Sequence, residues 1–194
     1  MAHRFSHAIA EGDGISVIVA VDDAQAAQAA ESQRAEALVV ERDPATVRAA
    51  TGLPILWRSN VPLEDASKVA DAYLLVFESL DDDDGRFEEL YGRALELGLD
   101  CVVDVRSEDE LEEALERADP EIFLLSPREP EGDDTPLERV LDLLASVPAG
   151  KLAIADLPHT TPSEIRELER AGVDAVIVRA QDIADLVGGP PPTV

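Results

Sequence analysis

The chain has 194 residues, a length typical of one domain, and its 45% hydrophobic content is ordinary for a folded globular protein. Its 42 acidic and 16 basic residues give a formal net charge of −26, which makes a surface that repels phosphate groups. We therefore expect neither nucleic acid nor a membrane among its partners. The sequence shows no apolar stretch of membrane-spanning length and no signal-peptide region, and its one cysteine cannot form an internal disulfide. These features predict a cytoplasmic protein.

Eight short runs rich in Val, Ile and Leu alternate with charged stretches that have helical spacing. Their near-continuous apolar character is typical of parallel strands covered on both faces. The pattern fits a doubly wound sheet or a barrel, and eight units of similar size favour the barrel, because closure leaves no sheet edge exposed. We therefore predict a compact, single-domain α/β protein, a (β/α)8 TIM barrel. The eight runs are Ile15–Val21, Ala37–Val40, Pro54–Trp57, Ala72–Phe77, Cys101–Val105, Ile122–Leu125, Leu152–Ala155 and Ala175–Val178.

The segments between the runs contain helix-start signals. A capping residue stands directly before a proline at Asp43, Thr135 and Thr161, and proline suits the first helical position. Ser107 and Glu110 have the spacing of a capping box. The predicted organisation is a short N-terminal segment, the barrel and a proline-rich tail, at residues 1–14, 15–187 and 188–194.

Three stretches of the chain, Leu53–Arg58, Leu97–Leu115 and Ala171–Val178, together resemble indole-3-glycerol phosphate synthase. Leu97–Val105, read together with the acidic helix Ser107–Leu115, is similar to that family's fifth βα unit, in which Gly-x-Asp precedes an apolar strand. Leu53–Arg58 is similar to its third strand and Ala171–Val178 to its eighth. The similarity runs from about Gly98 to Val178, is weak over the sixth unit and is faint before Leu53. It implies a phosphate-binding barrel.

The family's enzyme is a lyase of tryptophan biosynthesis. It closes and decarboxylates a carboxyphenylamino-deoxyribulose phosphate, using a lysine general acid, a second lysine and carboxylates at the strand ends. The resemblance places Arg58 at the general-acid lysine, and Val17 and Val19 at the first strand's glutamate and lysine. Arginine binds anions but does not readily release a proton, and valine has no acid–base chemistry. The resemblance therefore implies a degenerate site with weak or no lyase activity.

Other family positions keep a polar group. Asp104 and Asp156 match the glutamates of the fifth and seventh strands, and Ser126 matches the asparagine of the sixth. Such barrels hold phosphate on backbone N–H groups after strands 7 and 8. Here Pro158 has no N–H to donate, and Arg179 replaces the glycine of the eighth strand. The resemblance therefore implies an altered phosphate site.

The carboxyl ends of the strands define the candidate site, because barrel enzymes carry their chemistry there. Arginines follow the second, third, fifth, sixth and eighth strands. Paired N–H groups of arginine bind phosphate or carboxylate, so we expect a small anionic metabolite as the partner. The candidate catalytic residues are Asp104, Asp156 and Arg58. The candidate anion-binding residues are Arg58, Arg106, Ser126, Arg128, Arg179 and His159.

A closed network of ion pairs is the alternative interpretation of the same residues. In it, the arginines bind the carboxylates at neighbouring strand ends and simply fill the mouth of the barrel. The distinction depends on which side chains point inward. No cofactor and no metal are expected, since His3 and His7 lack a third ligand and Glu11–Gly14 precedes a strand instead of following one.

These observations leave three hypotheses. The leading one is a minimal barrel of the indole-3-glycerol phosphate synthase type with weak or no lyase activity. The second is an enzyme or binder for another small phosphate or carboxylate metabolite. The third is an inert scaffold or subunit-binding barrel. We expect a monomer or a weak homodimer.

Overall fold

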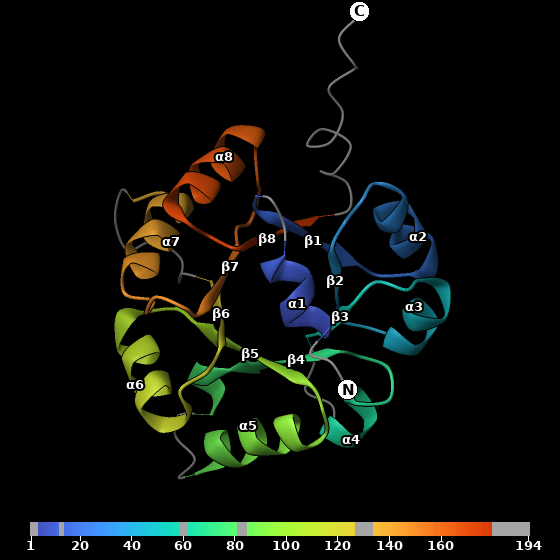
Figure 1. Ribbon diagram of the computed structural model, residues 1–194, viewed down its shortest axis with the longest axis horizontal. Coiled ribbons are helices and arrows are strands. Elements are labelled where there is room, and N and C mark those ends of the chain that lie inside the picture. Colours follow the sequence, from blue (N-terminus) through green and yellow to red (C-terminus); the bar gives the residue numbers. More distant parts are fainter. Residues whose placement is uncertain (1–3, 12–13, 59–61, 81–84, 127–133, 180–194) are drawn as a thin grey trace, which may run out of the picture.

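The computed structural model describes residues 4–11, 14–58, 62–80, 85–126 and 134–179. Within them, eight strands form a closed barrel in which each strand pairs in parallel with the next and β8 pairs with β1 (Figure 1). This confirms the predicted fold class, and every strand lies on its predicted run. The strands are β1 (Ser16–Val21), β2 (Ala37–Val40), β3 (Ile55–Trp57), β4 (Ala72–Val76), β5 (Asp100–Val105), β6 (Ile122–Leu125), β7 (Leu152–Asp156) and β8 (Ala175–Arg179).

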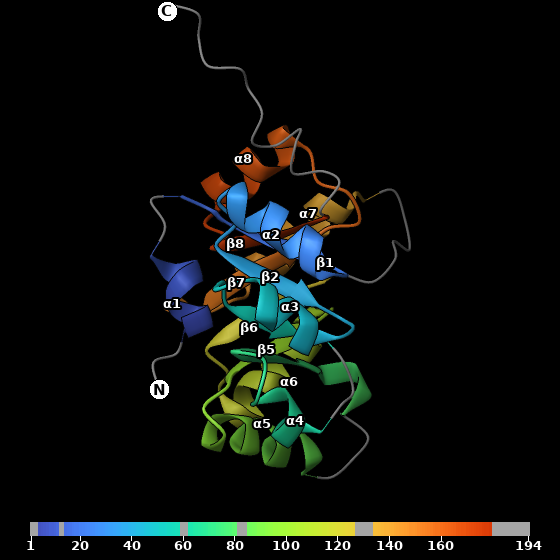
Figure 2. The same cartoon turned by 90° about the vertical axis from the view of Figure 1, so that its right-hand side faces the viewer.

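Helices connect the strands and surround the barrel (Figures 1 and 2). Thr135 and Thr161 cap their helices as predicted, and each also forms a capping box that was not predicted from the sequence. Ser107 also caps its helix, but the carboxylate of Glu110 accepts the backbone N–H of Arg106 at 2.8 Å, so no reciprocal box forms there. The helices are α2 (Ala24–Ser32), α3 (Pro44–Ala50), α4 (Leu63–Ala66), α5 (Arg86–Glu96), α6 (Glu108–Ala118), α7 (Pro136–Ala145) and α8 (Pro162–Ala171), with a 3-10 turn η1 (Phe77–Ser79) after β4. Among the described residues, none of these helices is long and apolar enough to cross a membrane.

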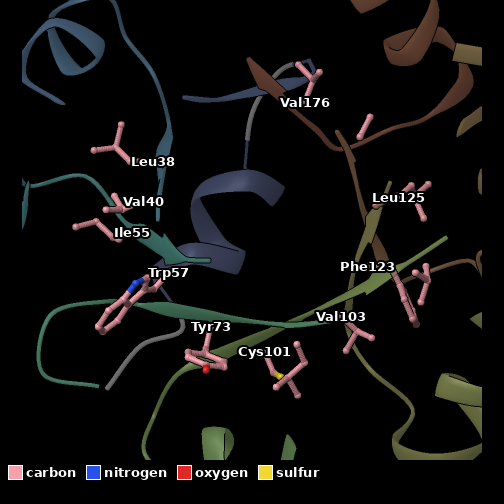
Figure 3. Packing of buried hydrophobic residues seen from close by; sticks show 14 of the residues in the cluster. Leu38, Val40, Ile55, Trp57, Tyr73, Cys101, Val103, Phe123, Leu125 and Val176 are labelled. Atoms are coloured by element: carbon pink, nitrogen blue, oxygen red, sulfur yellow. The ribbon is translucent and has the colours of Figure 1, made fainter. Parts of the chain in front are cut away.

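The core has two layers because successive strand residues face opposite sides of the sheet. One layer lies between the strands and the helices, and in Figure 3 its side chains point away from the barrel axis. It includes Leu38, Ile55, Tyr73, Val103 and Phe123. The other layer fills the barrel itself. It includes Ile18, Leu56, Val102, Ile154 and Ile177.

A helix not expected from the sequence, α1 (Arg4–Ala10), closes the end of the barrel at which the strands begin. Figure 1 shows it across the centre of the barrel. Phe5 and Ile9 are buried in the barrel-interior layer. The backbone N–H of Ser6 donates to the Asp100 carboxylate at 2.9 Å, and Ser16 donates to the carbonyl of Ile9 at 3.2 Å. The described helix of the N-terminal segment, α1, therefore closes this end of the barrel.

Candidate functional site

The opposite end of the barrel, where the strands finish, is the mouth. The inward-facing residues Leu56, Val102, Leu124, Ile154 and Ile177 each have a polar residue two positions later, on the same face of the strand. These polar residues are Arg58, Asp104, Ser126, Asp156 and Arg179. The strand geometry therefore brings five of the predicted site residues to the mouth.

An ion pair between Arg58 and Asp156 spans the mouth. Arg58 directly follows β3 and Asp156 ends β7, and these strands lie on opposite sides of an eight-stranded barrel. Their side chains are 22% and 12% exposed, and Glu41 places a carboxylate oxygen 3.9 Å from the Arg58 guanidinium. Burial lowers the pKa of Arg58, but the charges of Asp156, Asp104 and Glu41 raise it on balance. Arg58 therefore remains a cation and is held near the barrel axis.

In the described part of the mouth, Asp104 is the most deeply buried carboxylate, with 5% of its side chain exposed. It accepts a hydrogen bond from the hydroxyl of Ser126, and its other oxygen lies 3.9 Å from the Arg106 guanidinium. Burial raises the pKa of Asp104, and the Ser126 hydrogen bond with the charges of Arg106 and Arg58 only partly opposes this. Arg106 also forms an ion pair with Glu78. Asp104 thus has the environment of a carboxyl group that keeps its proton to a higher pH than usual.

A pocket of about 380 Å³ opens beside these pairs, between the ends of β8, β1 and β2. Arg42 and Asp22 form an exposed ion pair at 3.0 Å on its rim. Asp23 caps α2 by accepting the N–H of Ala26 at 2.8 Å. Arg179 is exposed and forms no ion pair with any residue in the described ranges. The pocket is lined by Ala20, Val21, Asp22, Asp23, Ala26, Val39, Glu41, Arg42 and Arg179.

Two positions differ from what the resemblance suggested. Val17 and Val19 belong to the layer that packs against the helices, so they do not face the site. The residues of β1 that face the barrel interior on the mouth side are Ile18 and Ala20, one position along, and these too are apolar. Ser16, on the same face, lies at the other end of the strand and donates to a backbone carbonyl of α1. The first strand therefore contributes no ionisable side chain to the barrel interior.

One further predicted residue, His159, lies apart from the cluster. His159 is exposed in the connection between β7 and α8 and has no hydrogen bond or ion pair within the part of the chain that the structure describes. Arg128 lies outside the described residues. Within the described ranges, no group of three or more His, Cys, Asp or Glu side chains has a metal-binding arrangement.

Neither lysine of the chain stands at the mouth. Lys68 precedes β4 and pairs with Asp65 at 2.8 Å, and Lys151 precedes β7 and pairs with Asp119 at 2.8 Å. Both lie at the strand-beginning side of the barrel. The positive charge at the described part of the mouth therefore comes from arginine.

Comparison with solved structures agrees with the (β/α)8 barrel fold. N-acetylmannosamine-6-phosphate 2-epimerase from Clostridium perfringens superposes with a TM-score of 0.70 at 15% sequence identity, covering 84% of this chain and 86% of that one. Thiamine phosphate pyrophosphorylase from Pyrococcus furiosus superposes with a TM-score of 0.66 at 18% identity, covering 89% and 90%. At such low identity, these similarities establish the fold alone.

Sequence comparison identifies the family. The family described as indole-3-glycerol phosphate synthase matches residues 59–183. Enzymes of that name from Shouchella clausii (strain KSM-K16) and Geobacillus sp. (strain WCH70) are 31% and 30% identical, covering 71% and 68% of this chain but 55% and 52% of their own lengths. The chain belongs to the indole-3-glycerol phosphate synthase family, and it spans about half the length of the curated relatives it matches.

Proposed function

We propose that the barrel mouth binds a small anionic metabolite and supports weak or no turnover of the family's lyase reaction. The observation that carries this proposal is the absence of lysine from the mouth, where Arg58 stands in the position that the resemblance gives to the general acid. A general acid must release a proton near the working pH. The pKa of Arg58 is raised, so this residue can bind an anion but is a poor proton donor.

The neighbouring carboxylates support binding more than proton transfer. Asp156 is engaged with Arg58, and Asp104 with Ser126. Arg179 stands at the end of β8, where the resemblance expects a glycine whose N–H meets phosphate. A guanidinium offers several N–H donors to phosphate or carboxylate, which compensates for the close backbone approach that a glycine would allow. Anion recognition can therefore persist at this mouth without the lyase chemistry.

A direct lyase assay tests the proposal. The purified protein is incubated with the carboxyphenylamino-deoxyribulose phosphate of the family reaction while indoleglycerol phosphate fluorescence is followed. We expect no turnover above the Arg58→Ala and Asp104→Ala variants, together with phosphate binding by calorimetry that Arg179→Gln abolishes. Turnover that either alanine variant eliminates would contradict weak or absent activity, and failure of phosphate and carboxylates to bind would contradict the binding site.

A closed charge network is the second candidate, and a specific observation favours it. Arg42, Arg58 and Arg106 each pair with a carboxylate at the mouth. If these pairs simply fill the space, the barrel is an inert scaffold or binds another subunit through a different surface. The same calorimetry distinguishes the two functions, since a scaffold binds none of the small anions.

A further inference from the structure

The pocket beside the Arg58–Asp156 pair has a small side chain at its base and charged side chains along its sides. Ala20 lies opposite Val39 of β2 on one side and Arg179 of β8 on the other, so its methyl group leaves space above β1. Glu41 follows Val39 by two residues and therefore faces the same side of β2. Arg179 and Glu41 thus flank the pocket from strands two positions apart, about 10 Å between their backbones.

Most of the other charges that line this pocket already have partners. Arg42 is paired with Asp22 at 3.0 Å, and the carboxylate of Asp23 caps α2. Glu41 is 55% exposed and makes only a distant contact, 3.9 Å, with Arg58, which Asp156 already holds. Arg179 has no ion pair within the described ranges. Among the described residues that line the pocket, one cation and one loosely engaged carboxylate therefore remain available on opposite walls.

This arrangement favours an anion that also carries a positive charge over a simple anion. An anionic group bound to Arg179 would lie in a pocket that also holds the negative charge of Glu41, inside a protein of net charge −26. Like charges at close range are unfavourable, and the cost grows where water is partly excluded. A ligand that carries an ammonium group toward Glu41 replaces that repulsion with an attraction.

We propose that the pocket between β8, β1 and β2 binds a small zwitterion, with its phosphate or carboxylate on Arg179 and its ammonium group on Glu41. The proposal rests on the proposed anion-binding function and names the class of metabolite. The volume of about 380 Å³ is in the range of small-molecule sites. The span between the two walls suits charges separated by a few carbon atoms.

Matched ligands test the inference by titration calorimetry on the full chain. O-phosphoethanolamine is compared with ethyl phosphate, and β-alanine with propionate, so that each pair differs by the ammonium group. In the pair that binds more tightly, we expect the ligand with the ammonium group to bind at least about tenfold more tightly than the ligand without it. This is the difference that one favourable charged hydrogen bond supplies. Whichever pair binds more tightly identifies phosphate or carboxylate as the anionic group.

Two variants and a control test the roles of Glu41 and Arg179 in binding. Glu41→Gln should bring the affinity ratio within a pair close to one, and Arg179→Gln should abolish binding of all four ligands. Arg166→Gln, on the exposed side of α8, should behave as wild type. Equal affinities within both pairs, or a ratio that Glu41→Gln leaves intact, would overturn the zwitterion assignment while leaving the anion site standing. Failure of the wild type to bind any of the four would overturn the proposed function as well.

Discussion

Breaking the Arg58–Asp156 ion pair measures how much this pair stabilises the folded barrel. The two side chains are 22% and 12% exposed, between a buried pair and a surface pair. Removing one partner of a fully buried pair costs about 3–5 kcal/mol, whereas exposed pairs contribute about 0.2–1 kcal/mol. We therefore expect a coupling free energy of about 1.5–3 kcal/mol between Arg58→Gln and Asp156→Asn.

The assay is a double-mutant cycle by urea denaturation at low and high salt. Arg42 and Asp22 supply the matched control, because this pair also lies at the mouth but its side chains are 77% and 71% exposed. Its coupling should be indistinguishable from zero and vanish with added salt. If the coupling of Arg58 with Asp156 is no larger than that of the control, the pair does not hold the mouth in solution. The description of Arg58 as held near the barrel axis by Asp156 would then be refuted.

Three further perturbations have defined outcomes. Phe5→Ala should lower the free energy of unfolding by about 3–5 kcal/mol, because Phe5 of α1 is fully buried, and a loss below about 1 kcal/mol would show that α1 does not seal the barrel. Leu95→Ala, at a side chain 44% exposed, serves as its control in the same denaturation series. Arg58→Lys should raise lyase turnover above wild type, since lysine can release a proton, and an unchanged rate would place the defect elsewhere in the site. Burial raises the pKa of Asp104, so the wild type loses stability as the pH rises through that pKa. Asp104→Asn lacks this loss and should gain stability over wild type as the pH rises through the acid range, whereas a difference independent of pH would contradict the burial.

Local sequence signals predicted the framework of the fold because they act over a few residues. The eight apolar runs became the eight strands, and Asp43, Thr135 and Thr161 cap their helices as expected. Once the strands are placed, alternation alone puts Arg58 and Asp156 at the mouth. The candidate site could therefore be located from the sequence, though only to the level of which strand ends carry which charges.

Long-range pairing could not be predicted in the same way. Nothing local to Phe5 and Ile9 indicates that they fill the barrel, because the strands they contact come from the whole length of the chain. The placement of Val17 and Val19 in the site was wrong by one residue, and a shift of one residue moves every side chain of a strand to the other face. The choice of Asp156 as the partner of Arg58 likewise depends on closure of the barrel, which brings β3 opposite β7.

Closure of the barrel divides the mouth into two parts that differ in how readily they can bind a ligand. Around Arg58, Asp156 and Asp104, buried charges satisfy one another, so a ligand entering there must displace an existing partner. Between β8 and β2, the small side chain of Ala20 leaves room, and the charge of Arg179 has no partner within the described ranges. A ligand gains most where no existing ion pair has to be broken, since only the surplus over displaced interactions appears as affinity. Binding is therefore expected first in the β8–β1–β2 part of the mouth, beside the position of the lost general acid and not on it.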